Sequence, residues 1–130
     1  MTHGPVLLTG IDHVVLLVGD IERSIEWYHE HLGLSAERVA EWRAGTALFV
    51  SLRVSDSFII DLLQEDPNGR NIDHLALVTD RKSFADFVAN HSAEIELGPM
   101  QLSGAQGDGK GAYFRDPDGH RIELRTYEQQ

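Results

Sequence analysis

The chain contains no cysteine among its 130 residues. Disulfide bonds, a cysteine nucleophile and cysteine-bound zinc or iron–sulfur sites are therefore excluded. Any metal ion that the chain binds must use histidine and carboxylate ligands.

Basic residues are few and form no cluster. The 11 Lys and Arg residues stand against 21 Asp and Glu residues, which gives a formal net charge of −10. Such a charge repels phosphate backbones, so we expect no nucleic-acid partner. The longest apolar runs, such as Val14–Val18, have five residues, far below the ~20 needed to span a bilayer. No secretory signal is recognisable, so we expect a cytoplasmic protein without a membrane partner.

The sequence repeats itself at about half its length. Ile11-Asp12-His13 recurs as Ile72-Asp73-His74, 61 residues further along. Each copy continues into an aspartate, Asp20 or Asp80, that is followed by apolar residues at helical spacing. Aspartate at this place is typical of a helix N-cap.

Each copy also ends in an apolar strand that carries one acidic residue. Asp61 and Glu123 follow the histidines of their copies by 48 and 49 residues. We therefore predict a single domain over residues 1–130, made of one module at about 10–65 and a second at about 71–127. Each module is predicted to run strand, helix and three strands.

Turn and strand signals predict the remaining elements of each module. A glycine-rich segment, Leu102–Gly111, has no periodicity and is predicted to be a mobile surface loop. The other expectations are strands at 37–42 and 46–54 joined by a hairpin turn at Ala44-Gly45, strands at 94–97 and 111–115, and a turn at 116–119.

Alternation places four polar residues on one side of the strands. Because alternate residues share a face, His13, Asp61, His74 and Glu123 are predicted to lie opposite the helices. Burying an unpaired carboxylate costs several kcal/mol. Two imidazoles and two carboxylates at matched positions therefore favour a divalent metal site. A metal-free network of histidines and carboxylates is the alternative.

Aromatic and basic residues are candidates for a substrate pocket. Trp42, Phe49 and Tyr113 are expected on strands that line it. Arg121 and Arg125 share the side of Glu123 by alternation, either as a clamp for an anionic substrate group or as a ladder of charges at the strand edge.

These motifs resemble the vicinal oxygen chelate superfamily, which includes glyoxalase I, fosfomycin-resistance enzymes, methylmalonyl-CoA epimerase, extradiol dioxygenases and bleomycin-resistance proteins. The likeness covers nearly the whole chain and is most specific at 11–13, 20–28, 32–34, 72–74 and 113–124. It implies an α+β fold in which paired βαβββ modules form a cupped, partly open mixed sheet with helices outside. It also implies a divalent metal and a homodimer.

The resemblance places the metal ligands on His13, His74 and Glu123, with Asp61 at the fourth position. It implies a lyase or isomerase of the glyoxalase type, acting on a small molecule that chelates Ni, Zn, Mn or Fe through two oxygens. Glu123 or Asp61 would move the proton as the catalytic residue. Asp61 is one methylene shorter than the glutamate of glyoxalase I, so it is either a ligand or a base.

Two other activities stay open within the superfamily. An extradiol dioxygenase would use Fe(II) or Mn(II) on His13, His74 and Glu123, leaving Asp61 out. A bleomycin-type protein would bind an antibiotic without catalysis, but such proteins lose the ligands that this chain retains. Val15 stands where fosfomycin enzymes have threonine, which argues against phosphonate chemistry, although Tyr113 matches a substrate-side tyrosine of that group.

Overall fold

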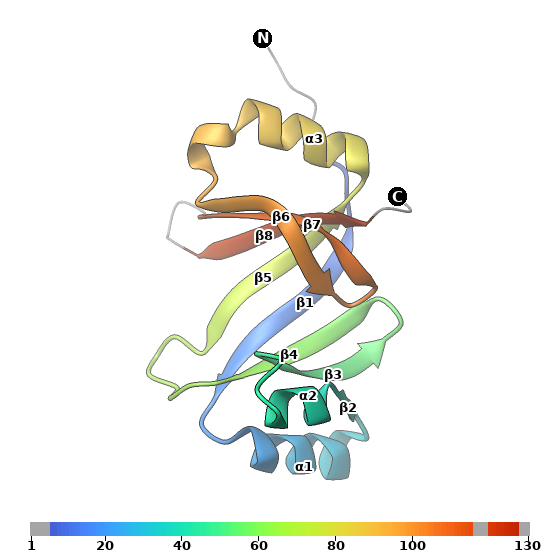
Figure 1. Cartoon of the computed structure of the whole chain (residues 1–130), viewed down its shortest axis with the longest axis vertical. Helices are drawn as coiled ribbons and strands as arrows, with labels where there is room; N and C mark the ends of the chain where they lie inside the picture. The colour runs from blue at the N-terminus through green and yellow to red at the C-terminus, as the bar shows by residue number, and fades with distance from the viewer. Residues whose placement is uncertain (1–5, 116–119, 128–130) are drawn as a thin grey trace. The chain divides into compact units, whose positions relative to one another are not determined.

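The computed structural model describes residues 6–115 and 120–127 (Figure 1). Its contacts divide the chain into two compact units, His13–Asp73 and the combination of Met1–Asp12 with His74–Gln130. The first is called the central unit below, and the second the terminal unit. The turn predicted at 116–119 lies outside the described residues, and the module limits of 10–65 and 71–127 stay predictions.

The central unit contains four strands and two helices. Its sheet has the order β2-β3-β4-β1, with β1 parallel to β4 and the other pairs antiparallel. Strand β1 begins in the terminal unit and continues into the central one. The elements are β1 (Leu8–Val18), α1 (Ile21–Leu32), β2 (Ser35–Glu37), α2 (Val39–Arg43), β3 (Val50–Ser55) and β4 (Phe58–Gln64).

The terminal unit repeats this order. Its sheet has the order β5-β8-β7-β6, with β5 parallel to β8 and the other pairs antiparallel. Its elements are β5 (Ile72–Thr79), α3 (Arg81–Asn90), the 3-10 turn η1 (Ser92–Glu94), β6 (Leu97–Gly104), β7 (Gly107–Arg115) and β8 (Arg121–Tyr127). The predicted α+β class with two βαβββ modules is thus confirmed.

Both long helices begin where the sequence predicts. The Asp20 carboxylate accepts a hydrogen bond from the Arg23 backbone N–H, and the Asp80 carboxylate accepts one from Ser83. Each helix then covers one face of the sheet in its own unit. The core between α1 and its sheet contains Ile21, Val50, Leu52 and Leu62. The core between α3 and its sheet contains Phe84, Ala112 and Leu124.

The repeat extends to the strand register. Asp61 on β4 lies opposite Val15 on β1, and Glu123 on β8 lies opposite Ala76 on β5. Val15 and Ala76 each follow a motif histidine by two residues. In each unit the acid therefore shares a sheet face with the histidine, on the side away from the helix, as alternation predicts.

The strand predicted at 37–42 is wrong. Residues Val39–Arg43 form the short helix α2, so no hairpin turns at 44–45, and β3 begins only at Val50. Val39 and Trp42 are three residues apart and both pack against the core beneath α1. This spacing suits a helix, whereas in a strand the two side chains would face opposite sides. The strand predicted at 94–97 likewise begins only at Leu97, after η1.

The mobile loop predicted at Leu102–Gly111 is also wrong. These residues form most of a β6–β7 hairpin whose tip is fastened to the sheet. The Ala105 backbone N–H donates to Asp12 at 3.0 Å, and the Gln106 N–H donates to the Tyr127 hydroxyl at 3.2 Å. A Cβ atom on Gly104 would lie closer than 3.0 Å to Arg125 and Tyr127. Glycine permits this close approach and does not signal mobility here.

None of the described helices is long and apolar enough to cross a membrane.

We expect Gly104→Ala to lower the free energy of unfolding by about 1–3 kcal/mol, because the added methyl would displace buried Arg125 or Tyr127. Urea unfolding monitored by circular dichroism measures the change. Gly19→Ala is the matched control, since a Cβ there meets nothing within 4 Å, and it should change the value by less than about 0.5 kcal/mol. Equal stability of the two variants would contradict the packing argument.

Candidate functional site

A buried histidine–glutamate pair lies at the centre of the terminal unit. His74 comes from β5 and Glu123 from β8, and their side chains are 4% and 1% exposed. The His74 Nε2 atom lies 3.1 Å from Glu123 Oε1. An acid and an imidazole at this separation, withdrawn from water, can share a proton or bind a cation together.

Arg125 neutralises the second oxygen of Glu123. Its Nη1 lies 2.9 Å from Glu123 Oε2, and the arginine side chain is fully buried. The guanidinium also donates to the backbone carbonyls of Ser103 at 2.8 Å and Leu102 at 3.0 Å, and Asp12 Oδ1 lies 3.8 Å from its Nε. Arg125 therefore lies beside Glu123 as a buried support of this carboxylate, and its contact with a substrate stays a prediction.

Tyr113 and Arg121 lie on the same side as the pair. Tyr113 on β7 contacts the His74 ring edge-on, with ring centroids 5.4 Å apart. The Arg121 guanidinium carbon lies 4.1 Å above the Tyr113 ring. Burial raises the pKa of Tyr113 above its ordinary value, and the nearby Glu123 carboxylate raises it further. The phenol is therefore a neutral hydrogen-bond donor at physiological pH.

The central unit carries the matching residues His13 and Asp61, both buried. Asp61 Oδ1 accepts a 2.6 Å hydrogen bond from the Ser51 hydroxyl and lies 3.5 Å from Arg38 Nη2. The same Arg38 nitrogen donates to Ser51 at 2.6 Å. In this unit Ser51 occupies the register position opposite the acid that Tyr113 occupies in the other.

Arg38 is the site residue that sequence reasoning missed. It precedes α2 with a φ of 65°, the only non-glycine residue with positive φ in the described part of the chain. This left-handed backbone directs the segment into the short helix and lets the side chain reach Asp61. No periodicity in the sequence signals such a position. The strand predicted at 37–42 gives no indication of a left-handed residue there.

Two predicted pocket residues do not lie on strands. Trp42 is in α2 and packs against the core beneath α1, on the opposite face from Asp61. Phe49 is half-buried and precedes the first residue of β3. Tyr113 is on the predicted strand. Contact of these three residues with a substrate stays a prediction.

Residues 10–124 match the description "Glyoxalase/Bleomycin resistance protein/Dioxygenase superfamily". The chain belongs to this superfamily. The match includes His13, Asp61, His74 and Glu123, and it agrees with the resemblance of the sequence motifs to the vicinal oxygen chelate proteins.

Curated members of the superfamily similar to the chain include several enzymes. A probable lactoylglutathione lyase of Synechocystis is 30% identical, over 86% of this chain and 91% of its own length. The glutathione transferase FosA of Serratia marcescens is 28% identical, over 92% and 82%. These two relatives are thus named as a probable lyase and a transferase.

Solved structures show the same fold. A Mn(II)-bound glyoxalase from Novosphingobium aromaticivorans superposes with a TM-score of 0.72 at 23% identity, covering 94% of this chain and 40% of that one. An extradiol ring-cleaving dioxygenase from B. fuscum gives 0.66 at 25% identity, covering 92% and 34%. The chain thus spans well under half of these two larger proteins.

The buried tyrosines predict a loss of stability in alkali. Burial also raises the pKa of Tyr127, with a further contribution from its hydrogen bond to Asp12. Because the pKa is raised in the folded state, the free energy of unfolding keeps its full value below about pH 10. Above that pH it declines by up to ~1.4 kcal/mol per pH unit for each tyrosine. Urea unfolding between pH 8 and pH 11.5 should show this decline.

Tyr113→Phe should make the decline shallower, because one of the two tyrosines no longer takes part. Below pH 9 the wild-type and variant curves should run parallel. Curves that stay parallel up to pH 11.5 would show that the Tyr113 phenol ionises equally in folded and unfolded chains.

Proposed function

We propose that this protein is a divalent-metal-dependent enzyme, a lyase or isomerase of the glyoxalase type. Its substrate would be a small molecule that presents two neighbouring oxygens to the metal. The observation that carries the proposal is the buried His74–Glu123 pair with its 3.1 Å separation, in a chain of a superfamily with metalloenzyme members.

The chemistry of the donors suits a divalent cation. His13, His74 and Glu123 offer two imidazole nitrogens and one carboxylate oxygen, and all three side chains are buried. This donor set suits Zn, Ni, Mn or Fe, and the lack of cysteine fits the same group of metals. When bound, the ion would supply a Lewis acid that polarises two substrate oxygens.

Arg125 supports the Glu123 carboxylate and leaves the oxygen that faces His74 for a second partner. Arg125 occupies Glu123 Oε2, and Oε1 remains directed at His74. Such a support fixes the orientation of a ligand carboxylate, as outer residues do at many metal sites. We assign the three ligand positions on this basis, with His13 included because its place in the repeat matches that of His74.

Asp61 is the candidate base, or the fourth ligand. One of its oxygens is held by Ser51 and Arg38, which fixes the carboxylate on the face that also carries His13. A fixed carboxylate can accept a proton from a carbon next to a substrate carbonyl if it lies within reach. Glu123 is the other candidate for this step.

Arg121 and Tyr113 are the proposed substrate-binding residues. The guanidinium stacked on the Tyr113 ring can pair with an anionic substrate group, and the phenol can donate a hydrogen bond. A homodimer remains part of the proposal, as the superfamily resemblance implies.

The metal ligands are tested by substitution. We expect His74→Ala, Glu123→Gln and His13→Ala each to weaken binding of Mn(II), Ni(II) or Zn(II) at least tenfold, because each removes a donor. Metal analysis of protein purified without an affinity tag, followed by chelator competition, measures the change. Circular dichroism checks that each variant is folded.

Each outcome points to a different conclusion. Wild-type metal affinity in His74→Ala or Glu123→Gln would overturn the assignment of the terminal-unit pair. Wild-type affinity in His13→Ala alone would remove only the central unit from the site. No uptake of any ion by wild-type protein would favour an antibiotic-binding protein with a buried polar network. Fe(II)-dependent consumption of oxygen with a catechol would instead favour the dioxygenase.

The role of Asp61 is tested separately. We expect Asp61→Asn to keep metal affinity within about threefold of wild type while turnover of 2-oxoaldehyde–thiol adducts falls at least a hundredfold, as loss of a general base predicts. Glu123→Gln is the matched comparison, because it makes the same change of acid to amide. Equal loss of metal in both variants would make Asp61 a full ligand.

A further inference from the structure

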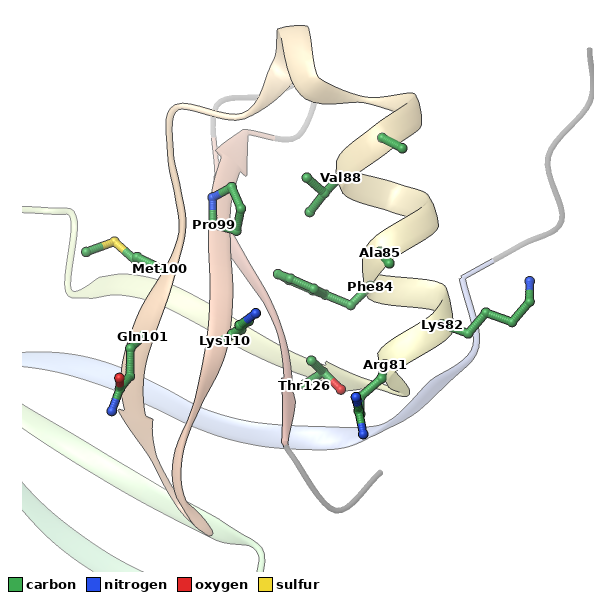
Figure 2. Close-up of a pocket in the computed structure, with 11 residues that line it drawn as sticks. Arg81, Lys82, Phe84, Ala85, Val88, Pro99, Met100, Gln101, Lys110 and Thr126 are labelled. Atoms are coloured by element: carbon green, nitrogen blue, oxygen red, sulfur yellow. The ribbon is translucent and has the colours of Figure 1, made fainter.

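A groove of about 840 Å³ lies between α3 and strands β6, β7 and β8 of the terminal unit (Figure 2). It lies on the sheet face that α3 covers, whereas His74 and Glu123 lie on the opposite face. The groove is therefore separate from these two proposed ligands. Its walls are apolar and include Phe84, Ala85 and Val88 of α3 and Pro99 of β6.

One end of the groove is positively charged. Arg81, the first residue of α3, and Lys110 of β7 both line it, and Figure 2 shows Lys110 pointing from its strand toward Phe84. None of the described residues that line the groove is acidic. In a chain with a net charge of −10, an acid-free groove with basic side chains favours an anionic occupant.

Three of the acidic residues close to this end in sequence have other partners. Asp80 accepts the N-cap hydrogen bond from Ser83, and Asp86 pairs with Lys82 at 3.0 Å. Asp108 accepts a hydrogen bond from Gln101, also at 3.0 Å. The charge of Lys110 is therefore not matched by an ion pair recorded in the described residues.

A buried hydroxyl lies at the same end. Thr126 of β8 is 5% exposed and lines the groove (Figure 2). Among the described residues its hydroxyl has no hydrogen-bond partner. The register places Thr126 opposite Lys110, so both side chains stand on the α3 side of the sheet. An unsatisfied buried hydroxyl is costly, and a bound acceptor would satisfy it.

We propose that this groove binds a small amphipathic anion, namely a carboxylate with an aliphatic chain. The carboxylate would lie between Lys110 and the Thr126 hydroxyl, and the chain would run along Phe84 and Val88 toward Pro99. Arg81 and Val88 are seven residues apart on α3, about 10 Å of helix, which suits a medium-length chain. The site would be an additional one, independent of the metal.

Titration with octanoate tests the proposal, with isothermal calorimetry for stoichiometry and methyl NMR of Ala85 and Val88 for location. We expect one saturable site per chain and shifts confined to the groove. Octan-1-ol and an octylammonium salt have the same chain without the negative charge, and both should bind at least tenfold more weakly. The titration is made with and without added metal, and the two results should agree.

Three variants test the named residues. Lys110→Met should weaken octanoate binding roughly tenfold and Thr126→Val roughly fivefold, as loss of a charged and a neutral hydrogen bond predicts. Arg43→Met is the matched control, because it also removes one positive charge, whereas Arg43 is paired with Glu22 in the central unit and does not line the groove. Its affinity should stay within twofold. Val88→Trp should fill the groove and abolish binding in a chain that circular dichroism shows to be folded.

The proposal is overturned if octanoate gives no saturable binding, or if octan-1-ol binds as tightly. It is also overturned if Lys110→Met and Arg43→Met bind octanoate equally, because the charge would then act only through the net charge of the protein. Loss of metal binding in the ligand variants leaves this experiment unaffected, so the two proposals fail independently.

Discussion

The buried guanidinium of Arg125 is the constraint on which the terminal unit depends. A cation with no exposure to water must be matched by acids and carbonyl oxygens, or its burial would cost several kcal/mol. Glu123, Asp12 and the carbonyls of Leu102 and Ser103 supply that match. One side chain thereby connects β8, the start of β1 and the β6–β7 hairpin. It also explains the glycine at the end of β6, since a side chain at Gly104 would occupy the place of Arg125.

Both units balance the charge of a buried acid, but they use different residues to do so. Each buries one acid on the sheet face away from its helix, and each supplies an arginine to that acid. In the terminal unit the arginine is Arg125, two residues along the same strand. In the central unit it is Arg38, from the turn before α2, and Ser51 adds a hydroxyl. The register of the acid against the first strand is the same in both units, and what differs is the place from which the arginine comes.

The repeat and the alternation of the strands made the sheet faces of the candidate site residues predictable. The spacing of His13, His74 and Glu123 predicted their faces, because period-two alternation in a buried strand leaves little freedom. Arg38 could not be found in this way, since its position depends on a left-handed backbone and on contacts distant in sequence. The hairpin within Leu102–Gly111 was hidden for a related reason. Gly104 and Gly109 leave room for Arg125 and Tyr127, which lie some twenty residues further along the chain.

Strand β8 shows why the register must be exact to one residue. Glu123 and Arg125 point to the polar face, while Leu124 and Thr126 point to the side of α3. A slip by one residue would exchange the two sets, burying charges beneath α3 and apolar residues at the proposed site. The pairs of β8 with β5 and β7 are correspondingly regular, and the irregularity in this unit lies between Leu97 and Met100, where β6 pairs with β7. The edge strand can absorb this bulge because Leu102 and Ser103, whose carbonyls bind Arg125, lie beyond it in the regular part of the pairing.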